Sequence, residues 1–195
     1  SVTVEDREGT EKRAYLLQTA EKGIAWLRLN AHGRAGHGSV PNPDNAIVHL
    51  AGAIERIAAH KWPREYIASV RELLDGLSGM TGVGWSDEDL DELLSHLGGA
   101  AGFVRGTLSD TANVTMLQAG YKQNVIPQHA YANVDCRFLP DHEDHLMATI
   151  RDLAGDQVEV EVLHRDIALD SPFGGDLVDA MKAALSVLEP ALTGA

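Results

Sequence analysis

Three polar residues, His37, Asn124 and Arg137, stand in short motifs whose composition suggests contact with another molecule. His37 lies between two glycines in the sequence GHGSVP, and glycines allow unusual backbone angles and the close approach of another group. Asn124 opens the sequence NVIP, and Arg137 lies in the sequence VDCRFLP. Each motif also has an ordinary structural interpretation: a tight turn, a capped turn, and a surface ion pair between Arg137 and Asp135. Spacing alone favours the ordinary interpretation of the histidine turn, because so short a motif recurs by chance.

The residues that could act as covalent nucleophiles are poorly placed for that role. Ser39 lacks the G-x-S-x-G pattern that exposes a nucleophilic serine at a strand-to-helix turn. Cys136, the only cysteine, falls on the apolar side of an alternating segment, where burial makes a thiol unreactive. A single cysteine allows no internal disulfide, which fits a reducing compartment, so we expect a cytoplasmic protein.

Composition limits the partners that this chain can have. Its 195 residues suffice for one ordinary domain with additional segments, and 44% hydrophobic residues can build a core. The formal net charge of −13 repels phosphate backbones and anionic membrane surfaces, so we expect neither nucleic acid nor a membrane as a partner. No stretch is long and apolar enough to span a bilayer.

Alternation of apolar and polar residues predicts the strands of one sheet. The clearest strand runs over 129–138, where every second residue is apolar: Ala130, Ala132, Val134, Cys136 and Phe138. The same pattern predicts strands that begin at Gly23, span about 111–121, and cover 158–162.

Two amphipathic helices are predicted between these strands. The first follows Asn42 and Pro43, which suit a helix cap and a first helical position, and the second runs from Pro140 to Gly155. The acidic stretch 64–97 is predicted to be an insertion with two short helices. The order predicts an α+β fold, a ferredoxin-like split β-α-β sandwich with a four-stranded antiparallel sheet and two helices on one face.

Taken in order, the sequences EKGIAWLRLNAHGRAGHGSVP, NVIP and VDCRFLP resemble the lid domain of one metallopeptidase family. Its members include aminoacylase, acetylornithine deacetylase, succinyl-diaminopimelate desuccinylase and glutamate carboxypeptidase. The resemblance implies a hinge over 1–20 from an absent catalytic domain and a dimerisation (lid) domain over 21–165, with a helical insertion at about 61–109. It also implies that 166–195, where Leu177 and Met181 suggest an amphipathic helix, return to the catalytic domain.

That resemblance implies an amide-cleaving enzyme, acting on N-acyl amino acids or small peptides, in which the work is divided between domains. The absent catalytic domain would hold two zinc ions and a glutamate general base, while the lid pairs with the lid of a second subunit to form a homodimer. His37 would reach into the partner subunit's site and stabilise an oxyanion. Asn124 would also contact substrate or oxyanion, and Arg137 would bind the substrate carboxylate.

We expect no metal site in this chain, and therefore no hydrolysis by the isolated chain. A dinuclear zinc site needs several His and Asp/Glu ligands from separate loops. The sequence His142-Glu143-Asp144 nominally matches the family's His-x-Asp ligand motif, but it falls in the first turn of a predicted helix, where acids favour the helix dipole. No Glu-Glu pair exists to supply the general base.

Two functions other than a lid are compatible with the same fold. A non-catalytic, dimeric ligand-binding or regulatory module of ferredoxin-like fold would need no metal, and the absence of His-x-Asp and Glu-Glu motifs on either side in the parent gene would favour it. RNA binding by the open sheet face has the least support. That face offers Tyr131 but also the acids Asp135, Glu159 and Glu161.

Overall fold

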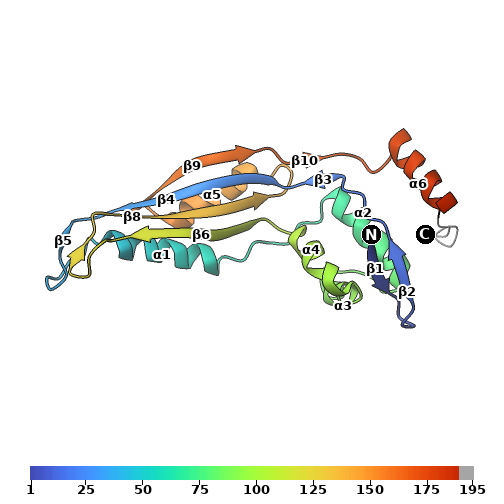
Figure 1. The fold of residues 1–195 in the computed structure, drawn as a ribbon, viewed down its shortest axis with the longest axis horizontal. Helices are drawn as coiled ribbons and strands as arrows, with labels where there is room; N and C mark the ends of the chain where they lie inside the picture. The colour runs from blue at the N-terminus through green and yellow to red at the C-terminus, as the bar shows by residue number, and fades with distance from the viewer. Residues whose placement is uncertain (189–195) are drawn as a thin grey trace. The chain divides into compact units, whose positions relative to one another are not determined.

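An antiparallel sheet of four strands, in the order β6-β8-β4-β9, is the main framework of the chain (Figure 1). The structure is a computed structural model, and residues 1–188 of it are described. The strands are β4 (Gly23–His32), β6 (Thr111–Ala119), β8 (His129–Phe138) and β9 (Val158–Asp166). These strands belong to one of the two units into which the chain divides, residues 22–63 and 109–168. The strands predicted from alternation are therefore confirmed.

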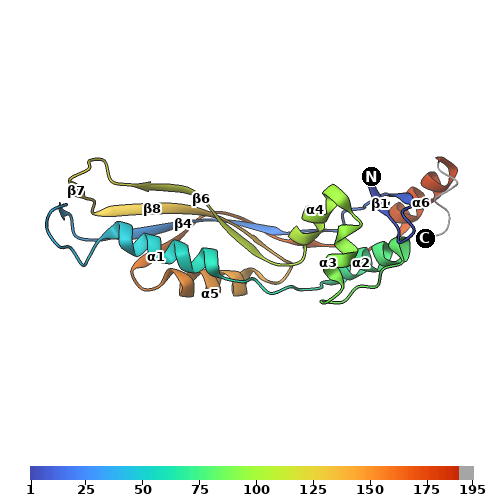
Figure 2. The same cartoon turned by 90° about the horizontal axis from the view of Figure 1, so that it is seen from below.

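Both helices of this unit lie on the same face of the sheet, below it in Figure 2. They are α1 (Ala46–Ala59) and α5 (Glu143–Ala154). Their buried side chains, among them Leu50, Ile57 and Ile150, pack on the alternate strand residues Leu27, Leu29, Ala132, Val134 and Cys136. The predicted α+β class is confirmed, and the element order β4-α1-β6-β8-α5-β9 is that of a split β-α-β arrangement.

The cap of α1 differs from the sequence prediction. Asn45, not Asn42, is the N-cap, and its side chain accepts a hydrogen bond from the Ile47 N–H at 2.9 Å. Asn42 lies further out, where its Oδ1 accepts from the Asp44 N–H and its Nδ2 donates to the Arg34 carbonyl. Two asparagines three residues apart are equally good caps by type, so only the packing of the helix decides between them.

The start of α5 is also later than predicted, whereas its end is confirmed. Asp141 adopts a positive φ of 65° and keeps Pro140 out of the helix, which starts at Glu143. Gly155 follows the last helical residue with a φ of 74°, a conformation that favours glycine.

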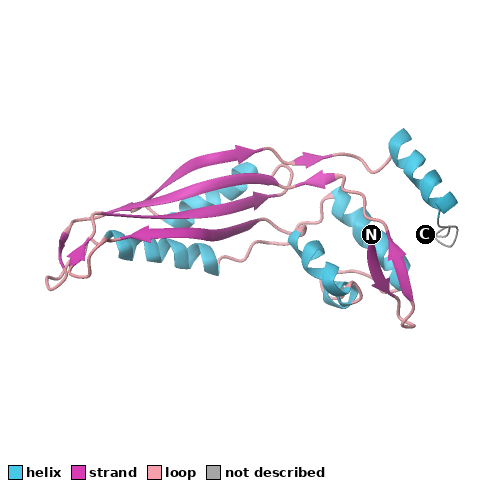
Figure 3. Ribbon diagram, viewed as in Figure 1, coloured by secondary structure: helices cyan, strands magenta, loops and turns pink. Residues whose placement is uncertain are grey.

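The second unit comprises 1–21, 64–108 and, among the described residues, 169–188. Figure 3 shows its helices in cyan and its short strands in magenta. They are β1 (Val2–Glu5), β2 (Glu11–Ala14), β3 (Ala20–Glu21), α2 (Ala68–Thr81), α3 (Leu90–Ser95), the 3-10 turn η1 (Gly98–Ala100), α4 (Ala101–Gly106), β10 (Leu169–Asp170) and α6 (Asp176–Leu188). None of the helices within residues 1–188 has the length and apolar content to cross a bilayer.

Residues 2–14, which the polar composition predicted as part of a hinge, form the hairpin β1-β2 instead. Val4 is buried among leucines of α2 and α3, such as Leu74 and Leu93. Val2 and Val4 alternate with Thr3 and Glu5 over only four residues, which is too short a pattern to reveal the strand. The helix predicted around Leu177 and Met181 is α6; the last residues of the predicted return segment, 189–195, lie outside the described part.

Replacing Gly23 with alanine is expected to lower the free energy of unfolding by about 1–3 kcal/mol. Gly23 pairs with Phe138 in the β4-β8 register, and an added Cβ would stand 2.1 Å from Cε2 of the buried Phe138 ring. Urea denaturation measures the change. Gly36→Ala is the matched control in the same unit, because its added Cβ meets no atom closer than 3.7 Å. Equal stability of the two variants would contradict the prediction.

Candidate functional site

Two loops meet beyond one end of the sheet and bring together residues that lie far apart in the sequence. Strand β5 (Gly36–His37) pairs with β7 (Val125–Ile126), with His37 opposite Val125. The Gly38 N–H donates to the Asn124 carbonyl at 2.9 Å, and the Gly33 N–H donates to the Gln128 carbonyl at 2.9 Å. We call this paired structure, residues 33–41 and 120–128, the tip.

The tip places His37 and Asn124 side by side, and both are exposed. The Asn124 Nδ2 lies 3.4 Å from the His37 Nε2. On the other side of the ring, Nδ1 accepts a hydrogen bond from the Ser39 N–H at 3.3 Å and lies 2.8 Å from the Ser39 hydroxyl. The two contacts suit opposite neutral tautomers: an Nδ1 that accepts from Ser39 puts the ring hydrogen on Nε2, whereas an Nε2 that accepts from the Asn124 amide puts it on Nδ1. The imidazole and the asparagine amide are two neighbouring polar groups, each able to donate a hydrogen bond, at an exposed end of the sheet.

Sequence reasoning overlooked the contact between Ser39 and His37. The signal was present, because a serine two residues from a turn residue often hydrogen-bonds within that turn. Ser39 is not placed as a nucleophile, but this contact gives it another role. By holding Nδ1, it determines which ring nitrogen of His37 faces Asn124.

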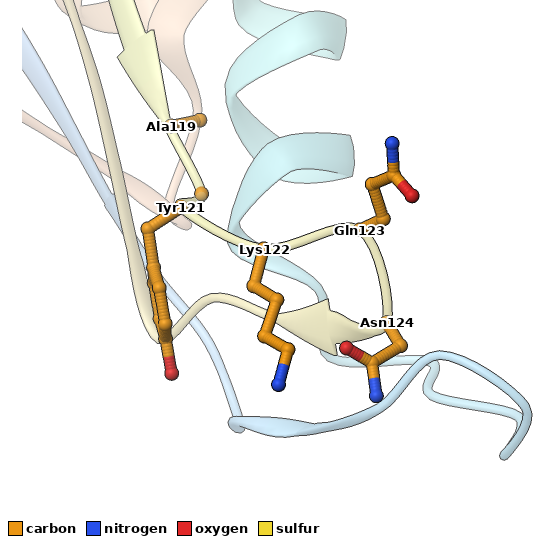
Figure 4. Close-up of a pocket in the computed structure, with 6 residues that line it drawn as sticks. Ala119, Tyr121, Lys122, Gln123 and Asn124 are labelled. Atoms are coloured by element: carbon orange, nitrogen blue, oxygen red, sulfur yellow. The ribbon is translucent and has the colours of Figure 1, made fainter.

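The two loops that carry His37 and Asn124 also expose large side chains. Tyr121 is 84% exposed and Val40 is 58% exposed, which is unusual for residues of such apolar area. A shallow hollow is lined by 119–124, and Figure 4 shows Tyr121, Lys122 and Asn124 on one side of the loop with Gln123 on the other. The tip therefore has the composition of a surface that another molecule covers.

Arg137 lies near the opposite end of the sheet from the tip. It stands on the half-buried polar side of β8, opposite Ile24 of β4 and Thr111 of β6. His129, which begins β8 at the tip end, is eight residues away, and an antiparallel strand rises about 3.4 Å per residue, so the separation is about 27 Å. One chain thus brings His37 and Asn124 together and holds Arg137 apart from them.

The residues that nominally resembled a metal-ligand motif have structural roles. His142 precedes α5, and its Nδ1 lies 3.3 Å from the buried carboxylate of Asp110, which also accepts the Leu139 N–H at 2.8 Å. Glu143 pairs with Arg165 at 3.1 Å. Within residues 1–188, no three His, Cys, Asp or Glu side chains are grouped as a metal ion would require.

Cys136 is fully buried against the helices, as its place in the alternation predicted. Burial, and to a smaller extent the Asp135 carboxylate, raises the pKa of the Cys136 thiol to about 12. The thiol is therefore protonated at neutral pH and cannot act as a nucleophile.

The chain is similar to known proteins in both sequence and fold. A family model described as the peptidase dimerisation domain matches residues 19–161. The N-fatty-acyl-amino acid synthase/hydrolase PM20D1 of Mus musculus is 26% identical over 161 residues, which cover 78% of this chain and 32% of that protein. PM20D1.1 of Danio rerio is 28% identical over 138 residues, 67% of this chain and 26% of that protein. The chain thus spans between about a quarter and a third of the length of these relatives.

Among solved structures, the M20 family metallo-carboxypeptidase Sso-CP2 from Sulfolobus solfataricus matches with a TM-score of 0.60 at 18% identity, covering 87% of this chain and 50% of that one. The di-peptidase Dug1p from Saccharomyces cerevisiae matches with a TM-score of 0.56 at 12% identity, covering 91% of this chain and 43% of that one. At these identities the two structures show a shared fold.

Proposed function

Because this chain belongs to the peptidase dimerisation domain family, we propose that it is the lid of a dinuclear zinc amidohydrolase or peptidase. The membership confirms the resemblance carried by the GHGSVP, NVIP and VDCRFLP sequences. The proposed substrate is an N-acyl amino acid or a small peptide, since relatives are named for N-fatty-acyl amino acids, carboxypeptidase and di-peptidase activity. Zinc in a catalytic domain would polarise the scissile carbonyl and lower the pKa of a bound water. The lid alone is expected to be inactive.

The observation that carries this proposal is the pair of donors at the tip. In the tautomer with hydrogen on Nε2, which the Ser39 N–H contact to Nδ1 favours, His37 presents one N–H, and the Asn124 amide nitrogen lies 3.4 Å away. Two preorganised donors this close can share one acceptor oxygen, which is the arrangement that stabilises the oxyanion of a tetrahedral intermediate. Their exposure supports a role in a pocket that the tip enters from outside.

The separation of Arg137 from the tip supports a site built from two subunits. In an N-acyl amino acid or dipeptide, the free carboxylate lies within two residue lengths of the scissile carbonyl, at most about 7 Å. Because Arg137 is about 27 Å from the start of β8 at the tip, one lid cannot hold both ends of one substrate. A two-fold homodimer resolves this: His37 and Asn124 act in the partner subunit's site, and Arg137 acts in its own subunit's site.

The edge of the sheet at β6, with the outer side of α1, is the proposed homodimer surface. Met116 and Leu117 on β6 are 57% and 65% exposed, and Val48 on the neighbouring α1 is 63% exposed. The other edge, β9, also exposes Val162 and Leu163, by 44% and 39%, but it carries the acids Glu159, Glu161 and Asp166 as well. Charged edge strands resist pairing, whereas an apolar edge beside an apolar helix surface favours it. The cytoplasmic location stays a prediction.

The role of Arg137 can be tested in an enzyme that joins this lid to its catalytic domain. Arg137→Ala is expected to raise KM for an N-acyl amino acid about tenfold to a hundredfold, because a charge-assisted bidentate contact is lost. KM for the corresponding N-acyl amino acid amide, which has no carboxylate, should hardly change. Arg165→Ala removes a guanidinium that pairs with Glu143 and serves as the matched control. Equal effects on both substrates would contradict the assignment.

A further inference from the structure

The Asp135 carboxylate lies directly beside Arg137 and accepts two hydrogen bonds from its guanidinium. The Arg137 Nε donates to the Asp135 Oδ1 at 2.7 Å, and the Nη2 donates to the Oδ2 at 2.9 Å. Both side chains are partly exposed, Arg137 by 39% and Asp135 by 30%. The contact therefore uses one complete edge of the guanidinium and both oxygens of the aspartate.

The backbone that carries this pair is fixed on both sides. Residues two apart in a strand project to the same face, and β8 is paired with both β4 and β6 along this stretch. Asp135 lies opposite Trp26 on β4 and Asn113 on β6. An aspartate side chain has only two rotatable bonds, so its carboxylate is held in place by the sheet and holds the long arginine side chain in turn.

We propose that Asp135 is a positioning residue that orients Arg137 to bind the carboxylate of the substrate. This inference rests on the proposed role of Arg137 as the carboxylate-binding group. With its Nε–Nη2 edge engaged by Asp135, the planar guanidinium has a defined orientation before the substrate arrives. The enzyme then loses less side-chain entropy when a second carboxylate binds.

A competing effect has the opposite sign and makes the proposal testable. The negative charge of Asp135 repels a substrate carboxylate at short range, so its removal could strengthen binding. Other charges near this pair do not decide which effect is larger. Lys22 is positively charged and Asp110, which interacts with it, is negatively charged, so their effects on a substrate carboxylate have opposite signs. If orientation dominates, removal of Asp135 weakens substrate binding; if repulsion dominates, removal strengthens it.

The test compares Asp135→Ala and Asp135→Asn in the enzyme that joins the lid to its catalytic domain. Orientation predicts that Asp135→Ala raises KM for an N-acyl amino acid about tenfold, with little change in kcat or in KM for the matching amide. Asp135→Asn, which keeps one oxygen acceptor, should raise KM less. A KM that is unchanged or lowered by Asp135→Ala overturns the inference, as does an equal rise in both variants, which would assign the effect to charge.

A matched control and a spectroscopic measurement separate positioning from a general structural role. Glu161→Ala removes an acid from the adjacent β9, where it accepts a bond from Asn30, and should leave KM unchanged. In the 195-residue chain, slow exchange of the Arg137 Nε–H by NMR should be lost in Asp135→Ala and retained in Glu161→Ala. Retention in Asp135→Ala overturns the inference.

Arg137→Ala, measured in parallel, distinguishes failure of this inference from failure of the proposed function. If Arg137→Ala raises KM for the acid but Asp135→Ala does not, Arg137 binds the carboxylate without help from Asp135, and only this inference fails. If Arg137→Ala does not discriminate between acid and amide, the proposed role of Arg137 fails and the inference fails with it.

Discussion

His37→Ala, in an enzyme that joins this lid to its catalytic domain, is expected to lower kcat about a hundredfold while the bound metal remains. The loss of one preorganised donor to an oxyanion has this magnitude, and the tip lies on loops that hold no metal-ligand cluster within residues 1–188. Steady-state kinetics and metal analysis measure the two quantities. His129→Ala, which removes an exposed imidazole from the start of β8, should leave kcat within about twofold.

A mixed dimer tests whether His37 acts in the partner subunit's site. When a His37→Ala subunit pairs with an Arg137→Ala subunit, one site receives the intact His37 of one chain and the intact Arg137 of the other. That dimer should recover about half of the wild-type kcat/KM, although each mutant homodimer is impaired. If both residues served the same subunit's site, every site in the mixed dimer would lack one of them, and no recovery would occur.

Local patterns predicted the framework because burial leaves a direct trace in the sequence. The alternation from Ala130 to Phe138 specifies which face of β8 is covered. The helical spacing of Leu50 and Ile57 marks the covered side of α1, whereas Ile47, which shares that spacing, is 41% exposed. The cap of α1 was misplaced because Asn42 and Asn45 suit the position equally well. The β1-β2 hairpin was missed because Val4 is the one buried residue of its strand.

The sequence motifs did not predict which residues of the candidate site lie side by side. His37 and Asn124 meet because β5 pairs with β7, a contact between residues 87 positions apart that no local pattern encodes. The motif order gave no measure of the distance to Arg137. That distance follows from the register of β8 along the sheet, and it is the observation that supports the proposed two-subunit site.

The dimer surface proposed on β6 and α1 leads to the second large expected effect. Leu117→Asp should weaken self-association by about two to three orders of magnitude, because an unpaired charge would be buried in the interface. Leu117 is 65% exposed on the edge strand, so the substitution leaves the core of the unit intact. Sedimentation equilibrium of the 195-residue chain measures the dimer dissociation constant.

Val162→Asp is the matched control, since it places the same charge on the opposite edge strand at a residue that is 44% exposed. Val162→Asp should remain a dimer. If Val162→Asp were instead a monomer and Leu117→Asp a dimer, the interface would lie on β9 and not on β6. In the enzyme with its catalytic domain, Leu117→Asp should also lower kcat/KM about as far as His37→Ala, with its metal retained. A monomer cannot receive His37 from a partner, so an active monomer would exclude the two-subunit site even if each assigned residue binds substrate.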